Sequence, residues 1–181
     1  MNKHKHAERV ILYIIFSFYI LLLVKLLFLS RLSTFAPIGG EKTASRYVNF
    51  IPFYSIMDYL FSSAEVVRRF SFTNLVGNIA VFIPLGVYLP LFKKNKNVSA
   101  NLIIVFAVSL FAETVQWLFG IGAADIDDII LNCLGGLLGI LLYKLFMFLS
   151  SERRAHTTIT GLSLSGLPII FYLLFIAKMN L

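Results

Sequence analysis

Long apolar runs recur along this sequence and decide what kind of protein it can form. A helix of roughly 20 apolar residues is long enough to cross a hydrocarbon core of about 30 Å. Of the 181 residues, 59% are hydrophobic and only 14% are charged, and the mean hydropathy is +0.85. We therefore predict an all-α integral membrane protein with about five transmembrane helices, at residues 10–30, 73–92, 100–119, 126–148 and 160–177.

The strongly basic composition has a simple explanation in such a chain. The net charge is +7, which in a soluble protein would indicate nucleic-acid binding. Here the basic residues flank apolar runs, where they set orientation and contact lipid phosphates. We therefore expect no nucleic-acid partner and a single membrane domain over residues 1–181. The first run exceeds the apolar region of about 7–15 residues in a cleaved signal peptide, so we expect it to be kept as a helix.

Lys and Arg near the ends of the runs predict the orientation. If the N-terminus is cytoplasmic, the cytoplasmic side carries Lys3, Lys5, Arg9, Lys93, Lys94, Lys96, Arg153 and Arg154. The turn at residues 120–124, on the opposite side, has no Lys or Arg. We therefore predict a multi-pass protein with a cytoplasmic N-terminus, an extracellular C-terminus and a first extracellular loop over residues 31–72.

One part of this loop is unusually apolar. Residues 47–55 are rich in aromatic side chains but too short to span a bilayer, and Pro52 opposes a regular helix at their centre. We predict a re-entrant or interfacial segment, tucked against the outer ends of the helices over residues 47–61. The alternative is an aromatic belt segment that rests on the lipid headgroups.

Polar residues lead directly into the fourth apolar run. Asp125, Asp128, Asn132, Gly135 and Gly139 recur at nearly helical spacing and share one helix face. A carboxylate or amide in hydrocarbon costs several kcal/mol unless it is paired or hydrated. This face is therefore expected to point at other helices or at a water-filled recess, and the two glycines are expected to let helices pack closely.

Three predicted helices place polar groups at one depth. At about 1.5 Å per residue, Asn78, Glu113 and Asn132 come out roughly 7–10 Å below the outer helix ends. We predict one polar cluster in the outer half of the membrane, either a functional site or a structural hydrogen-bond network. For Asp125 and Asp127 a further alternative is capping of a helix. The predicted members are Asn78, Glu113, Gln116, Asp125, Asp127, Asp128 and Asn132.

Basic and helix-distorting residues accompany this cluster. Arg46, Arg68 and Arg69 of the long loop are on the same predicted side, where they would neutralise the carboxylates or bind a phosphate headgroup. Pro84 removes a helical hydrogen bond, which predicts a kink close to Asn78. We group Pro84 with Gly86 as kink and packing positions.

The order and spacing of these residues resemble the pattern of the VanZ-like family. The resemblance covers roughly residues 47–145, with an upstream motif at Asn49-Phe-Ile-Pro-Phe53. The remaining motifs are Asn78-x-x-x-Phe82-x-Pro84-x-Gly86, Glu113-x-x-Gln116, Asp125-x-Asp-Asp128, and Asn132 with the glycines after it. The resemblance implies a bacterial polytopic membrane protein. The founding member of the family is associated with low-level resistance to teicoplanin-type glycopeptide antibiotics, and the family has no established catalytic residues to transfer.

Two function classes are compatible with the cluster. In the first, which we favour, the protein binds or shields membrane lipids or a lipid-linked cell-wall precursor at the outer leaflet, without catalysis. In the second, the same carboxylates serve an enzyme or a translocator of phospholipid or polyprenyl-linked substrates, and a translocator of five helices would require a homo-oligomer. We assign no catalytic residue, metal or cofactor. His4, His6 and His156 all lie in predicted cytoplasmic segments, which excludes a histidine-ligated zinc site on the outer face. Under the enzymatic alternative, the possible metals are therefore hard cations bound by oxygen ligands.

Overall fold

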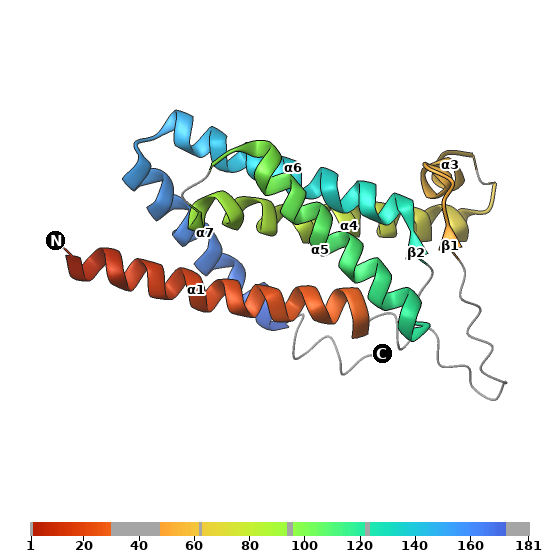
Figure 1. Ribbon diagram of the computed structural model, residues 1–181, viewed down its shortest axis with the longest axis horizontal. Coiled ribbons are helices and arrows are strands. Elements are labelled where there is room, and N and C mark those ends of the chain that lie inside the picture. The colour runs from red at the N-terminus through yellow and green to blue at the C-terminus, as the bar shows by residue number, and fades with distance from the viewer. Residues whose placement is uncertain (1, 30–47, 62, 94–95, 122–123, 173–181) are drawn as a thin grey trace. The chain divides into compact units, whose positions relative to one another are not determined.

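The computed structural model describes residues 2–29, 48–61, 63–93, 96–121 and 124–172. The chain divides into two compact units (Figure 1). The first is formed by residues up to 36 and from 144 onward, and the second by residues 37–143. The candidate site lies entirely in the second unit.

The first unit consists of the N-terminal helix and the C-terminal part of the chain. Helix α1 spans Asn2–Val24 and continues into a π-helical turn, η1, at Lys25–Leu29. Helix α7 spans Glu152–Phe171 and packs against α1. Leu12, Ile15 and Tyr19 of α1 are buried at intervals of three and four residues, as expected for a helix with one packed stripe.

Three long helices form the second unit. They are α4 (Glu65–Phe92), α5 (Val98–Phe119) and α6 (Ile126–Leu149). The last residues of α6, from Lys144 onward, belong to the first unit. The side chain of Asn97 caps α5 by accepting a hydrogen bond from Ser99 N at 3.0 Å. At its other end α5 stops at Gly120, whose φ of 63° is readily adopted by glycine. The short connections make consecutive helices antiparallel.

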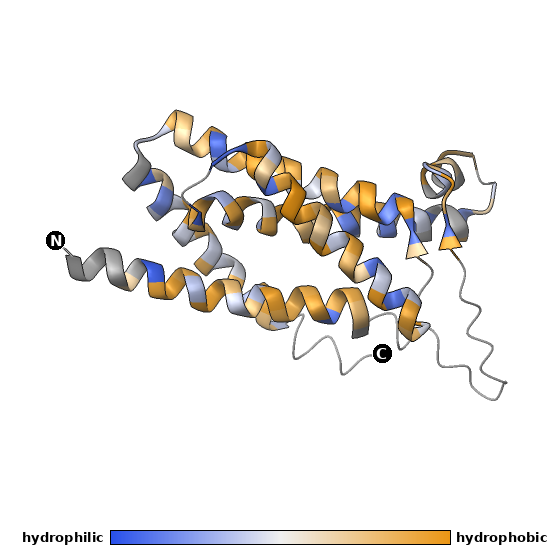
Figure 2. Ribbon diagram, in the orientation of Figure 1, coloured by the Kyte–Doolittle hydropathy of each residue, from blue (hydrophilic) through white to orange (hydrophobic). Residues whose placement is uncertain are grey.

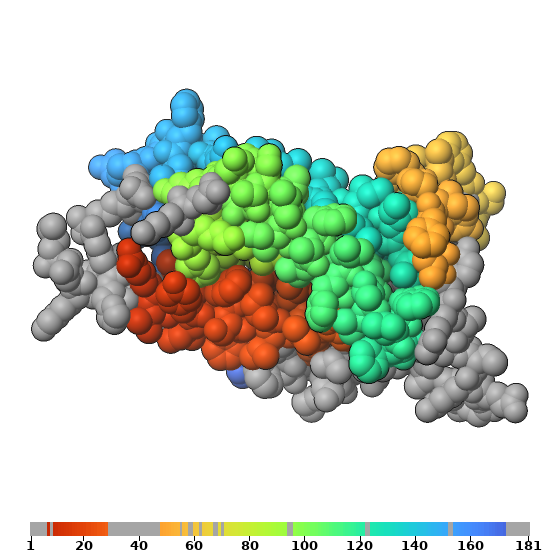
Figure 3. All heavy atoms as spheres, in the orientation of Figure 1, coloured from red at the N-terminus to blue at the C-terminus, as the bar shows by residue number. Residues whose placement is uncertain are grey.

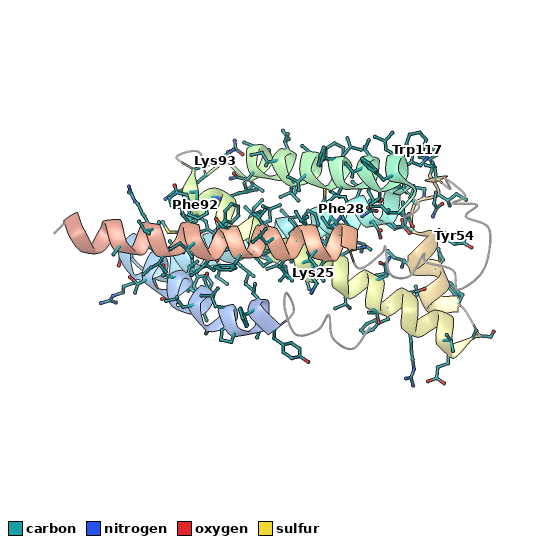
Figure 4. The ribbon with its side chains drawn as sticks, turned by 90° about the horizontal axis from the view of Figure 1, so that it is seen from below. Lys25, Phe28, Tyr54, Phe92, Lys93 and Trp117 are labelled. Carbon is teal, nitrogen blue, oxygen red and sulfur yellow. The ribbon has the colours of Figure 1, made fainter. Side chains whose placement is uncertain are left out.

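A short segment closes one end of this unit. Strand β1 (Val48–Asn49) pairs in parallel with β2 (Ala124–Asp125), with Asn49 opposite Asp125. Helix α3 (Tyr54–Phe61) follows β1 and packs on α4. Figure 4 shows Tyr54 and Trp117 near this end, whereas Phe92 and Lys93 lie at the opposite end of the unit. Aromatic side chains at the end of a spanning helix are typical of a membrane interface.

Small residues allow the backbones of α4 and α6 to touch. A Cβ on Gly135 would lie 2.2 Å from the carbonyl oxygen of Ile79, and one on Gly139 would lie 2.1 Å from that of Ile83. A Cβ on Gly86 would lie 2.1 Å from the carbonyl oxygen of Gly136. No larger side chain fits without moving a helix, so these glycines form a closely packed seam.

The all-α membrane class predicted from the sequence is confirmed. Among the described residues, four helices are long and apolar enough to cross a membrane: Arg9–Phe28, Ser71–Phe92, Val98–Phe119 and Ile126–Leu149. The protein is therefore a multi-pass membrane protein, and the described part contains four such helices rather than five. The predicted span at 160–177 falls partly within α7, which begins with the polar residues from Glu152 onward, and its last residues lie outside the described part.

The predicted loop at residues 31–72 includes the first turns of a helix. Helix α4 begins at Glu65, whereas its apolar span begins at Ser71, close to the predicted residue 73; Glu65, Arg68 and Arg69 lie in the turns before this span. The helix is continuous through Pro84 and Pro90. Residues 30–47 lie outside the described residues, and the rest of the predicted loop contains β1, α3 and the beginning of α4.

Candidate functional site

Hydrophilic residues lie in α5 and α6 near the paired strands β1 and β2 (Figure 2). Asp128, in the first turn of α6, accepts hydrogen bonds at the same oxygen, Oδ1, from two amides of α4. Asn74 Nδ2 lies 3.1 Å from this oxygen and Asn78 Nδ2 lies 2.5 Å from it. The two asparagines are four residues apart, so one helix face presents both amides to one carboxyl group.

The two other acidic residues of this stretch fix the segment around β1. Asp125 Oδ1 accepts hydrogen bonds from Asn49 Nδ2 at 3.3 Å and from Asp127 N at 3.0 Å. The second contact makes Asp125 the N-cap of α6. Asp127 Oδ1 in turn accepts a hydrogen bond from the backbone N–H of Phe53 at 2.5 Å. Asn49 and Phe53 therefore both donate hydrogen bonds to carboxyl groups next to the start of α6.

Phe53 has an unusual backbone. Its φ is 67°, and no other described non-glycine residue has a positive φ. This left-handed conformation costs an L-residue roughly 1–2 kcal/mol. The hydrogen bond to Asp127 and the turn into α3, where Met57 N donates to Phe53 O at 2.9 Å, hold the residue in this conformation.

Helix α5 contributes a buried polar face. Glu113 Oε2 accepts a hydrogen bond from Asp125 N at 3.1 Å, so this carboxyl group binds the backbone of β2. Deeper along the helices, Ser109 Oγ accepts a hydrogen bond from Asn132 Nδ2 at 2.9 Å. Asn132 Oδ1 is buried and has no hydrogen-bond partner among the described residues. Gln116 is fully buried on the same face of α5.

The carboxyl groups differ in how far they reach solvent. Glu113, Asp127 and Asp128 are only 1–3% exposed, whereas Asp125 is partly exposed. Burial raises the pKa of Asp125 above its ordinary value, and the neighbouring Asp127 and Asp128 carboxyls act in the same direction. Among the described residues, no group of three or more His, Cys, Asp or Glu side chains is arranged to hold a metal ion.

The structure brings the predicted cluster together at one end of the second unit. Two sets of contacts connect its members: Glu113 accepts from Asp125 N and Asp125 accepts from Asp127 N, whereas Asn78 donates to Asp128, the next residue along α6. Asn132 lies one turn further along α6 from Asp128 and is linked to α5 through Ser109. Gly86, Gly135 and Gly139 lie in the glycine seam.

The predicted arginines are placed differently. Arg69 belongs to α4, is exposed, and pairs with Glu65 one turn earlier, with Arg69 Nη2 2.7 Å from Glu65 Oε1. This pairing gives Arg69 an acidic partner on its own helix, and headgroup binding by Arg69 stays a prediction. Arg46 and the side chain of Arg68 lie outside what the structure describes.

The predicted list also missed members of the network. Asn49, Asn74, Ser109 and the backbone N–H of Phe53 all bind predicted residues. Asn74 and Ser109 stand four residues from Asn78 and Glu113, so helical spacing was an available signal for both. Asn49 and Phe53 belong to the upstream motif, but their partners follow from a strand pairing that spacing does not reveal.

Comparison with known proteins agrees with the resemblance. The VanZ/LLP1 family model matches residues 16–147. The chain is similar to Protein VanZ of Enterococcus faecium, with 39% identity over 75 residues. This match spans 41% of the present chain and 47% of the relative, so the chain covers about half of that protein. No solved structure matches the chain significantly. Because the family model covers most of the sequence, the chain belongs to the VanZ/LLP1 family.

Proposed function

We propose that this protein acts at the outer leaflet of a bacterial plasma membrane, where it binds or shields a lipid-linked cell-wall component. It thereby contributes low-level resistance to teicoplanin-type glycopeptide antibiotics, and it does so without catalysis. The proposal extends to this chain the association of its family with that resistance. The outer position follows from the orientation predicted from Lys and Arg.

One observation carries the proposal. Asn78, Glu113 and Asp128 come from three different helices: Asn78 donates to the buried Asp128, and the buried Glu113 accepts from Asp125 N, three residues before Asp128. Ionisable groups inside a membrane are expensive, and they often mark a functional site. Asp125 is the partly exposed carboxyl of this network, so it is the proposed point of contact with a polar ligand. The buried carboxyls position it and the segment around β1.

Drug susceptibility tests this proposal. The protein is expressed in a sensitive Gram-positive host, and inhibitory concentrations of a teicoplanin-type lipoglycopeptide and of vancomycin are measured. The variants are Glu113→Gln and Asp128→Asn, which each keep an oxygen as hydrogen-bond acceptor while removing the carboxyl. Glu65→Gln is the matched control, because Glu65 is an exposed carboxylate outside the network that pairs with Arg69.

The expected result is a selective rise in the inhibitory concentration of the lipidated drug. This rise persists in Glu65→Gln and is lost in Glu113→Gln and Asp128→Asn at equal membrane abundance. Full protection by both network variants would overturn the role of the cluster. No protection by the wild-type protein would overturn the resistance role. Purified protein would then be assayed with candidate lipids and divalent cations, which tests the enzymatic or translocating alternative.

A further inference from the structure

The segment between β1 and α4 has its polar groups turned inward. Asn49 is only 6% exposed, and its side chain both donates to Asp125 and accepts from Ile51 N at 3.1 Å. The backbone N–H of Phe53 donates to Asp127. Backbone and amide groups that would otherwise need water therefore have partners within the protein.

The apolar side chains of the same segment point outward. Exposed fractions reach 77% for Phe50 and 75% for Phe61. We call the exposed members the aromatic surface: Phe50, Ile51, Phe53, Tyr54, Met57, Leu60 and Phe61. Figure 3 shows this segment as a lobe beside the first turns of α6.

This arrangement is the reverse of one suited to water. In water, burial of apolar area contributes about 25 cal/mol per Å², so a contiguous exposed patch of large apolar side chains is unfavourable. In a bilayer the requirement is different, because every backbone polar group must be satisfied internally and apolar side chains meet lipid. The internal partners of Asn49 and of the N–H groups of Ile51 and Phe53, together with the exposed apolar side chains, match the second requirement rather than the first.

The neighbouring helices also carry exposed apolar side chains. Phe72 and Val76 of α4 are exposed, and so are Leu118 and Phe119 at the end of α5 near Trp117. The exposed ion pair between Glu65 and Arg69 marks the part of α4 that precedes its apolar span, which begins at Ser71. The aromatic surface therefore adjoins both the apolar spans and the polar boundary.

We propose that the aromatic surface docks into the apolar boundary of the leaflet at this end of the helices, with the membrane lipid as its partner. Asp125 and Asp127 hold the segment in the orientation that makes this docking possible. The inference rests on the membrane-spanning fold and the described contacts, so it stands independently of any role in drug resistance.

Spin labelling tests the docking. Cys133 is the only cysteine, so a Cys133→Ser chain accepts single nitroxide labels at Phe50→Cys or Phe61→Cys. The labelled protein is placed in phosphatidylcholine and phosphatidylglycerol vesicles, and collisions with oxygen and with a water-soluble nickel chelate are measured. References are Phe111→Cys on the exposed apolar side of α5 and Glu65→Cys on the polar part of α4.

Labels at positions 50 and 61 are expected to collide mainly with oxygen, as the label at position 111 does. Preferential collision with the nickel chelate, as at position 65, would overturn the docking. Replacing Asp127 with Ala removes the acceptor for Phe53 N and is expected to increase nickel collisions at position 50 but not at 111. An unchanged label at position 50 in a folded Asp127→Ala chain would overturn the orienting role of Asp127.

Discussion

Asn78 Nδ2 lies 2.5 Å from Asp128 Oδ1, so a single contact joins the middle of α4 to the first turn of α6. Replacing Asp128 with Ala leaves the partly buried amides of Asn74 and Asn78 without this acceptor. Because a buried polar group without its partner costs about 1–3 kcal/mol, we expect a loss of stability of this order. Reversible unfolding of the purified protein in mixed micelles measures it.

A double-mutant cycle isolates this contact. Asn78→Ala and Asp128→Ala are expected to show a coupling energy of about 0.5–3 kcal/mol, since the residues are in direct contact. The control cycle combines Asn78→Ala with Glu65→Ala, which share no partner, and it should be additive within about 0.3–0.5 kcal/mol. Additivity in the first cycle would mean that the contact adds nothing to stability.

The glycine seam predicts that the cost of a Gly→Ala substitution depends strongly on the position of the glycine. Gly139→Ala places a Cβ 2.1 Å from the carbonyl oxygen of Ile83, so α4 and α6 must separate. Overpacking of this kind costs about 1–3 kcal/mol. Gly77→Ala is the matched control on α4, because a Cβ there has no atom within 4 Å. Thermal unfolding should show a clear loss for Gly139→Ala and none for Gly77→Ala, and equal losses would contradict the close packing of the seam.

The positive φ of Phe53 predicts that glycine is more stabilising than alanine at this position. Phe53→Gly and Phe53→Ala both remove the aromatic ring, but only glycine adopts a φ of 67° without strain. The glycine variant should therefore be more stable than the alanine variant by roughly 1 kcal/mol. At the neighbouring exposed Phe50, where φ is not positive, the same pair should show no advantage for glycine. Denaturation of the four variants tests the comparison.

The raised pKa of Asp125 predicts that the free energy of unfolding depends on pH. The folded protein binds this proton more tightly than the unfolded chain does, so the ionised carboxyl opposes folding above the raised pKa. This cost is lost as the pH falls through the raised pKa toward the ordinary value of 3.8. Asp125→Asn keeps an acceptor oxygen and removes the charge. Its melting temperature should exceed that of the wild type at neutral pH, and the difference should shrink as the pH falls.

Much of this architecture follows from spacing along single helices. The rise of a helix predicts an equal depth for Asn78, Glu113 and Asn132; in the structure Asn78 contacts Asp128, one turn before Asn132, and Asn132 contacts Ser109, one turn before Glu113. The phase of α6 likewise puts Gly135 and Gly139 on the face that contacts α4. Within one regular element, position in the sequence translates directly into position in space.

The remaining features depend on contacts that no local pattern encodes. The pairing of Asn49 with Asp125 requires a parallel bridge between strands of two residues each, which carry no periodic signal. The pairing of Arg69 with Glu65 follows from helical turns of α4 that precede its apolar span, and hydropathy does not detect such turns. Burial of Asp127 and Asp128 to within 2% exposure also depends on how three helices converge.

The bridge between β1 and β2 also constrains how the protein is made. Asn49 precedes Asp125 by 76 residues, so a ribosome releases the first long before the second. Until Asp125 and Asp127 have been synthesised, the amide of Asn49 and the N–H of Phe53 lack these acceptors. The contacts that hold the segment around β1 therefore form only after the chain has been made as far as the start of α6.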